Sequence, residues 1–105
     1  MKKRERIKNK EEFDNMIKNT NSKKNSFFII HTNPKKEMNS RFGIAVGTKV
    51  GNAVTRNKLK RQMREIINEE RILFENELDY IIIVRKSCLG LNYNQMKMNL
   101  IELIK

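Results

Sequence analysis

Cysteine and histidine are almost absent from this chain of 105 residues, in which Cys88 and His31 are the only ones. A single cysteine excludes an internal disulfide, and one cysteine with one histidine cannot form a Cys/His metal site. The sequence also lacks a Gly-rich phosphate loop, a Walker lysine pattern and a Ser/His/Asp arrangement. We therefore do not expect a nucleotide-dependent or acyl-transfer enzyme, and we interpret Cys88 as a small residue at a strand end.

Long apolar segments are missing as well. No run approaches the roughly 18 residues of a membrane-spanning helix, and the N-terminal "MKKRERIKNKEEF" lacks the apolar segment of a secretory signal. We expect a cytoplasmic protein without a membrane partner. Chains of this size bury one core, so we expect a single domain over residues 1–105.

Acidic residues are scarce in the first part of the chain. Residues 1–64 contain eighteen Lys/Arg and five Asp/Glu, whereas residues 65–105 contain five and seven, and the net charge is +11. No carboxylate lies between Glu37 and Glu65. This regional surplus predicts a polyanionic partner, with nucleic acid ahead of an anionic membrane surface.

Apolar periodicity predicts three helices. Asn9 can cap a helix over residues 10–18 with Glu12 as its capping-box partner, and Asn92 can cap the last helix. Between them, residues 53–74 follow a cap at Asn52, and their apolar side chains fall within an arc of roughly 120°. This arc, the predicted core face, contains Leu59, Met63, Ile66, Ile67, Leu73 and Phe74.

Three other segments have strand composition. Residues 25–32 and the start of 41–51 are predicted to be antiparallel neighbours, and the apolar run over residues 79–86 suits the centre of a sheet. The predicted order is α-β-β-α-β-α. The fold class is α+β, with one sheet covered by helices.

The segment "RNKLKRQMRE", residues 56–65, concentrates positive charge at the start of the long predicted helix. Arg56, Lys60, Arg64, Asn57 and Arg61 form a stripe beside the apolar arc, at about 0° to 140° on the helical wheel, while Lys58 points elsewhere. Helix dipoles favour the opposite order, with carboxylates first and cations last. The order suits anion binding by side chains and backbone N–H groups, although a merely solvated basic face remains the alternative, as it does for "MKKRERIK" at the N-terminus.

The stretch "RFGIAVGTKVGNAVTRNKLKRQMRE" resembles the bacterial ribonuclease P protein subunit, whose signature is an "RNxxKRxxRE" helix after a "GNAV" turn. "KKRERIKNKEEF" looks like the N-terminal segment of that family, and "DYIIIVRK" like its last strand, so the resemblance covers nearly the whole chain. The signature positions are occupied by Arg56, Asn57, Lys60, Arg61, Arg64 and Glu65.

The resemblance implies a fold like the second domain of ribosomal protein S5, with an unusual left-handed crossover between parallel strands. It implies binding to the catalytic RNA of ribonuclease P and to the 5′ leader of precursor tRNA, in a 1:1 complex with a monomeric protein. The RNA would perform Mg²⁺-dependent hydrolysis, and the protein would hold no metal and no catalytic residue. The implied contacts to the catalytic RNA are Lys49, Arg56, Asn57, Lys60, Arg61 and Arg64.

A cleft between the first helix and the sheet would hold the single-stranded leader, with Phe13, Ile17 and His31 lining it. Ile17 and His31 stand where the family often has aromatic residues. Stacking of a base on an aromatic ring contributes about 1–3 kcal/mol, whereas isoleucine offers only apolar contact. The resemblance therefore predicts a weaker leader grip or one that depends more on charge. Phe13 as a plain core residue and His31 as a strand residue without a role are the alternatives.

Two other functions compete with this interpretation. A protein-only nuclease would need clustered carboxylates, for which Glu11, Glu12, Asp14 and Glu37 are the candidates, although capping and the helix dipole explain the first three. A structural RNA-binder, such as a ribosomal protein, or a DNA-binding protein would share the composition. Only the signature distinguishes these from the ribonuclease P subunit.

Overall fold

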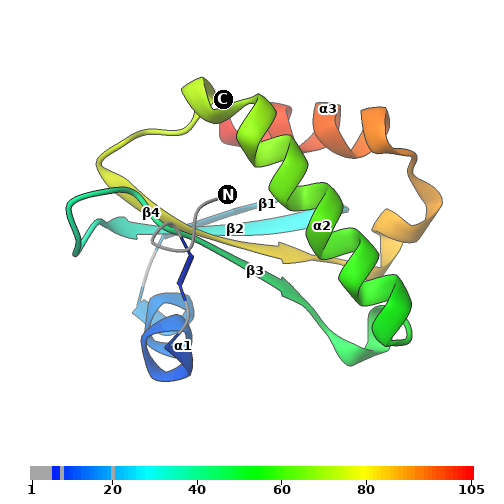
Figure 1. Ribbon diagram of the computed structural model, residues 1–105, viewed down its shortest axis with the longest axis horizontal. Helices are drawn as coiled ribbons and strands as arrows, with labels where there is room; N and C mark the ends of the chain where they lie inside the picture. The colour runs from blue at the N-terminus through cyan, green and yellow to red at the C-terminus, as the bar shows by residue number, and fades with distance from the viewer. Residues whose placement is uncertain (1–5, 8, 20) are drawn as a thin grey trace.

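The computed structural model describes residues 6–7, 9–19 and 21–105, which form a four-stranded mixed sheet with helices on both faces (Figure 1). The strands are β1 (Asn21–Lys24), β2 (Phe28–Pro34), β3 (Phe42–Val46) and β4 (Leu78–Val84). Their spatial order is β1-β2-β4-β3, in which β2 is antiparallel to β1 and β4, and β3 is parallel to β4. The sheet interior therefore contains β4, as its apolar run predicted.

Two sequence predictions about the sheet were wrong. The segments containing β2 and β3 are not neighbours, because β4 lies between them. The strand β1 was not predicted, since its sequence NSKK is polar and fully exposed and leaves no hydrophobic pattern. It is held by backbone pairing to β2, and the Asn25 side chain closes the turn by accepting hydrogen bonds from the N–H groups of Phe27 and Phe28, both at 2.8 Å.

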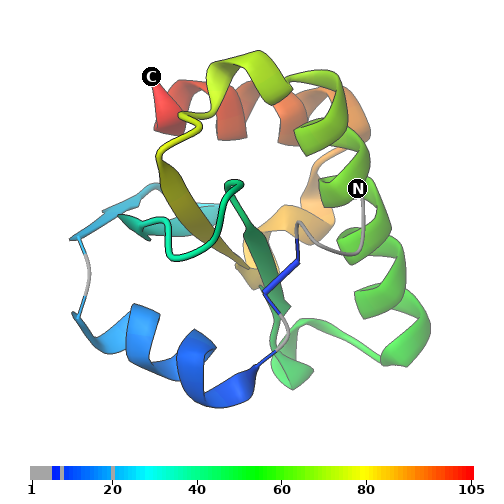
Figure 2. The same cartoon turned by 60° about the vertical axis from the view of Figure 1, so that its left-hand side comes forward.

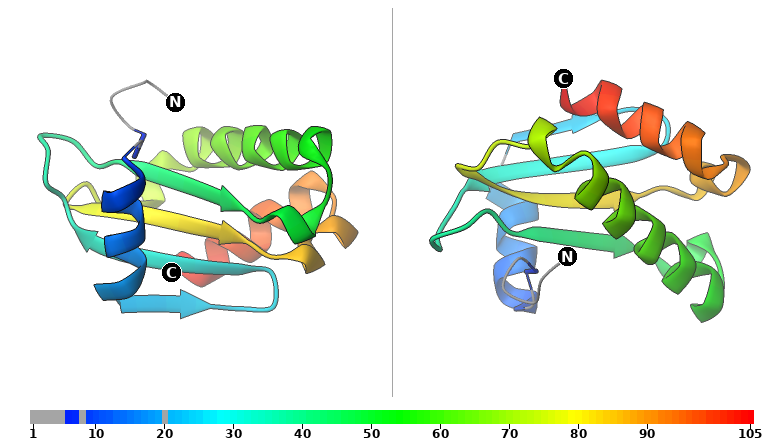
Figure 3. Two further views of the ribbon diagram at one scale, coloured as in Figure 1. Left: turned by 90° about the horizontal axis from the view of Figure 1, so that it is seen from below. Right: turned by 45° about the horizontal axis from the view of Figure 1, so that its top comes forward.

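The helices lie on opposite faces of the sheet. The helix α1 (Lys10–Asn19) lies against one face, and α2 (Ala53–Glu69) and α3 (Tyr93–Ile104) cover the other (Figures 2 and 3). The predicted caps are confirmed at Asn52 and Asn92, and Asn92 forms a full capping box with Gln95. Short 3₁₀ segments occupy the connections: η2 (Thr48–Val50), η3 (Arg71–Leu73) and η4 (Lys86–Gly90).

The main core lies between the sheet and the pair α2 and α3. The predicted face of α2 is confirmed, since Leu59, Met63, Ile66 and Ile67 are all buried. The same periodicity was wrong for Leu73, which is 40% exposed. The α-helix ends at Glu69, and η3 breaks the 3.6-residue period beyond it, so Phe74 is buried while Leu73 turns outward.

Cys88 also contributes to this core. It is buried in η4, just beyond the end of β4, and its thiol donates a hydrogen bond to the carbonyl of Phe27. The cysteine thus packs as the small residue that the sequence predicted.

A smaller cluster joins α1 to the opposite face of the sheet. Ile7, Met16 and Ile81 are buried there, and Phe13 and Ile17 pack against them. Asn9 caps α1 by accepting a hydrogen bond from the N–H of Glu12 at 3.1 Å. This small contact area and the cap place α1 over the sheet.

The connection from β3 through α2 to the adjacent parallel strand β4 is a left-handed crossover (Figure 3). Such connections are rare, because nearly all crossovers between parallel strands are right-handed. The fold class expected from the resemblance is therefore confirmed in its sheet, its helices and its crossover.

Candidate nucleic-acid interface

The start of α2 is capped by Asn52 and carries no carboxylate in its first turn. The Asn52 side chain accepts a hydrogen bond from the N–H of Thr55 at 2.9 Å. Arg56 turns back toward the same end, where its Nε donates to the carbonyl of Gly51 at 3.1 Å. A guanidinium therefore lies beside the positive end of the helix dipole, an arrangement that favours an anion.

The six predicted RNA contacts lie in η2 and along α2. Lys49, Asn57 and Arg61 are exposed, whereas Arg56, Lys60 and Arg64 are half-buried. Within the described part of the chain, no carboxylate forms an ion pair with any of their cationic side chains. The structure thus presents an unneutralised cationic surface, called the α2 basic row below: Lys49, Arg56, Asn57, Lys60, Arg61 and Arg64.

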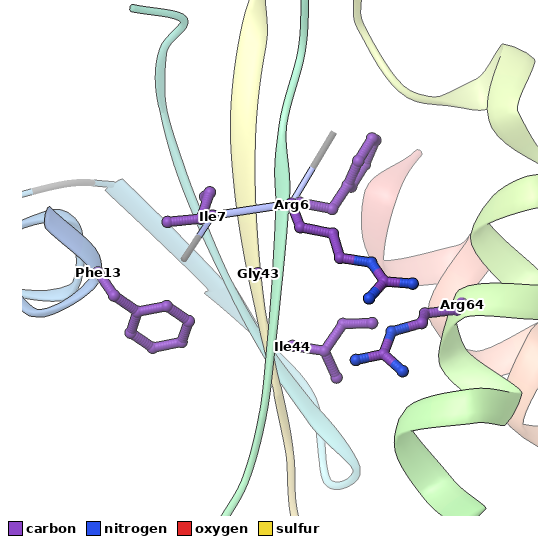
Figure 4. Close-up of a pocket in the computed structure, with 7 residues that line it drawn as sticks. Arg6, Ile7, Phe13, Gly43, Ile44 and Arg64 are labelled. Atoms are coloured by element: carbon purple, nitrogen blue, oxygen red, sulfur yellow. The ribbon is translucent and has the colours of Figure 1, made fainter. Parts of the chain in front are cut away.

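The basic row ends at a pocket of about 250 Å³ at the outer edge of β3 (Figure 4). The guanidinium groups of Arg6 and Arg64 approach each other there from separate segments of the chain. Burial lowers the pKa of Arg64, and the neighbouring charge of Arg6 lowers it further. Two facing cations make this pocket a candidate site for a phosphate.

Arg6 was not among the residues predicted for the site. Arg6 is held at this edge by an isolated β-bridge to Phe42 of β3. In this bridge the N–H of Ile7 donates to the carbonyl of Phe42 at 3.0 Å. The basic N-terminus gave a compositional signal, but only the pairing with β3 aligns Arg6 with Arg64. The remaining N-terminal basic residues, 2–4 and 8, lie outside the described residues, as does most of the "MKKRERIK" segment.

The predicted leader residues gather on the α1 face of the sheet. The Phe13 ring lies over Gly43, where an added Cβ would be only 2.7 Å from Phe13 Cε2. In the register of the sheet, Ile81 is flanked by Gly43 on one side and His31 on the other. Phe13 and His31 therefore lie on the same face of the sheet, Phe13 over β3 and His31 on β2, with Ile81 of β4 between them.

Ile17 and His31 are both half-buried at this surface. Ile17 packs against the cluster of Ile7, Met16 and Ile81, so it contributes apolar surface to the helix side. Burial lowers the pKa of His31, which favours a neutral imidazole at neutral pH. The predicted leader surface, called the α1 cleft below, thus offers apolar or uncharged side chains at Phe13, Ile17 and His31, of which Phe13 lines the pocket at the edge of β3.

The structure separates the two predicted groups of residues. The α2 basic row lies on the helix pair side of the sheet and the α1 cleft on the other side. The two meet at the edge strand β3, because the pocket is lined by Phe13 from α1 and by Arg64 from α2.

The carboxylates considered for a nuclease site do not converge. In the described ranges, no group of three His, Cys, Asp or Glu side chains is placed to hold a metal ion. Glu12 instead pairs with Arg41 at 2.7 Å, which replaces the second half of its predicted capping box. No helix within these ranges is both long and apolar enough to cross a membrane.

Fold and surface together define a small basic α+β protein suited to binding nucleic acid. Residues 1–105 match the Ribonuclease P family, so the chain belongs to that family. Membership makes it a bacterial protein of tRNA processing and the protein component of a ribonuclease, and it implies an RNA partner.

Relatives and solved structures agree with this assignment. The chain is 38% identical, over its whole length and 92% of the relative's, to the ribonuclease P protein component of a Bacillus cereus strain. The ribonuclease P protein of Thermotoga maritima superposes with a TM-score of 0.86 at 30% identity, covering 96% of each chain. The Staphylococcus aureus protein gives 0.86 at 33% identity, covering 95% of this chain and 92% of the other.

Proposed function

We propose that this protein is the RNA-binding subunit of ribonuclease P and assists removal of the 5′ leader from precursor tRNA. It binds the catalytic RNA through the α2 basic row and the leader through the α1 cleft. The observation that carries the proposal is the unneutralised basic row meeting the Arg6–Arg64 pocket at the edge of β3.

The basic row suits a folded RNA because its side chains start from a rigid support. Leu59, Met63 and Ile66 anchor α2 in the core, so the cations project from fixed positions. Contacts to phosphates depend on such positions and on charge, and they carry little sequence information. This mode of binding fits recognition of one RNA by its shape.

The α1 cleft suits an unpaired strand. Phe13 offers a ring face for stacking, and the bare backbone of Gly43 leaves the ring room to lie close to the sheet. Ile17 and neutral His31 add apolar and polar contact without a fixed charge. We therefore expect the leader to be held with modest affinity and little base preference.

Chemistry belongs to the RNA in this proposal. The catalytic RNA carries the Mg²⁺ ions and hydrolyses the phosphodiester, while the protein raises substrate affinity and lowers the metal requirement. We assign no catalytic residue and no metal site to the protein. It acts in the cytoplasm, as a monomer bound to one RNA.

A salt titration with two substrates tests the proposal. Contacts between five or six cations and phosphates predict that log Kd for the catalytic RNA changes with log salt with a slope of about 4. The assembled complex should bind precursor tRNA with a leader more tightly than tRNA without one. Equal affinity for the two substrates would contradict the leader role, and equal affinity for ribosomal RNA would favour a structural RNA-binder.

A further inference from the structure

Arg41, which directly precedes β3, and the first two residues of β3 each hold a different part of the N-terminal region. Arg41 pairs with Glu12 of α1, the carbonyl of Phe42 accepts the N–H of Ile7, and Gly43 gives space to the ring of Phe13. The placement of α1 over the sheet therefore depends on one short stretch of the chain.

The first of these contacts is a buried network of charges. Arg41 is only 8% exposed, and its two terminal nitrogens donate to Glu12 Oε1 at 2.7 Å and to Asp79 Oδ2 at 2.9 Å. Asp79, which is 1% exposed, also accepts from the backbone N–H of Arg41 at 2.9 Å. Burial alone would lower the pKa of Arg41, but its hydrogen bonds to both carboxylates raise it.

The network connects the helix to the middle of the sheet. Glu12 lies in the first turn of α1, next to Phe13, and Asp79 lies in the interior strand β4. Arg41 bridges them across the start of β3. A planar guanidinium with a carboxylate on each side fixes direction as well as distance, whereas apolar contacts are not directional.

We propose that Glu12, Arg41 and Asp79 form a positioning network for leader binding, which holds α1 at the height and rotation that present Phe13 to the leader. This inference rests on the proposed function of the α1 cleft. Glu12 and Arg41 act through Phe13 and do not touch the substrate themselves.

Other contacts cannot fix α1 so closely. A ten-residue helix is marginal by itself, and its apolar anchors are the few members of the Ile7, Met16 and Ile81 cluster. Apolar packing of this kind holds the helix against the sheet but supplies no directional contact that sets its rotation. Removing the charged bridge should therefore leave α1 attached but less well placed.

Asp79 lies two positions before Ile81 in β4 and therefore shares the α1 face of the sheet, and Glu12 lies in α1 itself, so both carboxylates of the network are on the side away from the α2 basic row. Loss of the network should thus affect the leader and spare assembly with the catalytic RNA. This separation distinguishes a positioning role from general destabilisation, which would weaken both interactions.

The test uses the assembled complex of full-length protein, catalytic RNA and precursor tRNA, with Glu12→Gln and Glu12→Ala as variants. Glu11→Ala is the matched control, because it removes an exposed carboxylate from the same helical turn without touching the network. We expect Glu12→Ala to weaken binding of leader-bearing precursor about fivefold. Glu12→Gln, which can still accept a hydrogen bond, should have a smaller effect. Affinity for leaderless tRNA, affinity for the catalytic RNA and the cleavage rate at saturating substrate should not change.

Nuclear Overhauser effects between the Phe13 ring and the α-protons of Gly43 report the placement directly. They should be strong in the wild type and in Glu11→Ala, and weakened in Glu12→Ala. If Glu12→Ala changed neither the nuclear Overhauser effects nor the affinity for leader-bearing precursor, the positioning role would be overturned while the proposed function stayed intact. A wild-type complex without any preference for the leader would overturn both.

Discussion

The guanidinium groups of Arg6 and Arg64 face each other across a pocket at the outer edge of β3, although 57 positions separate them along the chain (Figure 4). Like charges so placed repel, and the partial burial of Arg64 strengthens the repulsion by excluding water. The free protein therefore keeps an unfavourable contact that a bound phosphate would convert into a favourable one.

Sulfate or phosphate should raise the melting temperature of the free protein more than chloride does at equal ionic strength. Each kcal/mol of stability that anion binding adds should raise the melting temperature by about 4–8 °C. The variant Arg64→Gln should reduce the shift because it removes one side of the pocket. Lys58→Gln is the control on the same helix, since Lys58 is exposed and outside the basic row. The same anion-dependent shift in both variants would contradict an anion site at Arg64.

Replacing Arg61 with alanine should weaken assembly with the catalytic RNA without lowering protein stability. Arg61 is exposed and forms no ion pair with a carboxylate of the described residues, so its loss leaves no buried group unsatisfied. If it contacts one phosphate, the slope of log Kd against log salt should fall by about one unit. Filter binding over a salt series measures this slope. An unchanged slope would remove Arg61 from the interface.

Adding a methyl group at Gly43 should displace Phe13. The new Cβ would lie 2.7 Å from Phe13 Cε2, so the half-buried ring must swing away from the sheet. We expect Gly43→Ala to lower the free energy of unfolding by about 1 kcal/mol and to weaken leader binding. Gly47→Ala is the matched control, because no atom lies within 4 Å of its Cβ position and its backbone suits alanine. Equal unfolding midpoints for the two variants would show that the ring does not need this space.

Stability should fall at mildly acidic pH, partly because of His31. Its pKa in the folded protein is lowered from 6.5 by burial, so below that pH the unfolded chain binds a proton more readily than the folded one. The contribution of neutral His31 to the stability of the folded protein is therefore complete above pH 6.5. It is lost as the pH falls through the lowered pKa that His31 has in the folded protein. Urea unfolding at about pH 7.5 and 5.5 should show that the free energy of unfolding falls less between these pH values in His31→Gln than in the wild type. If the free energy of unfolding fell equally in both proteins, a lowered pKa of His31 would be contradicted.

Local features of the fold were predictable from the sequence because their physical causes are local. The apolar stripe of α2, the caps at Asn52 and Asn92 and the interior position of β4 each follow from spacing or composition within one segment. The left-handed crossover came only from the family resemblance, since general rules favour the opposite hand.

Features that join distant segments were not predictable in this way. The insertion of β4 between β2 and β3 leaves no periodic trace, and the polar strand β1 exists through backbone pairing alone. For the same reason, no local pattern indicated that Arg6 would meet Arg64, or that Glu12 would pair with Arg41 in place of completing its capping box. Each depends on tertiary geometry that one segment cannot encode.

The role of this protein as an accessory subunit can be measured by cleavage of a 5′-extended precursor tRNA at low Mg²⁺, with a bacterial ribonuclease P RNA and this protein each present or absent. We expect efficient cleavage at the mature 5′ end only when both are present. Cleavage by the protein alone, or no stimulation of the RNA by the protein, would contradict it.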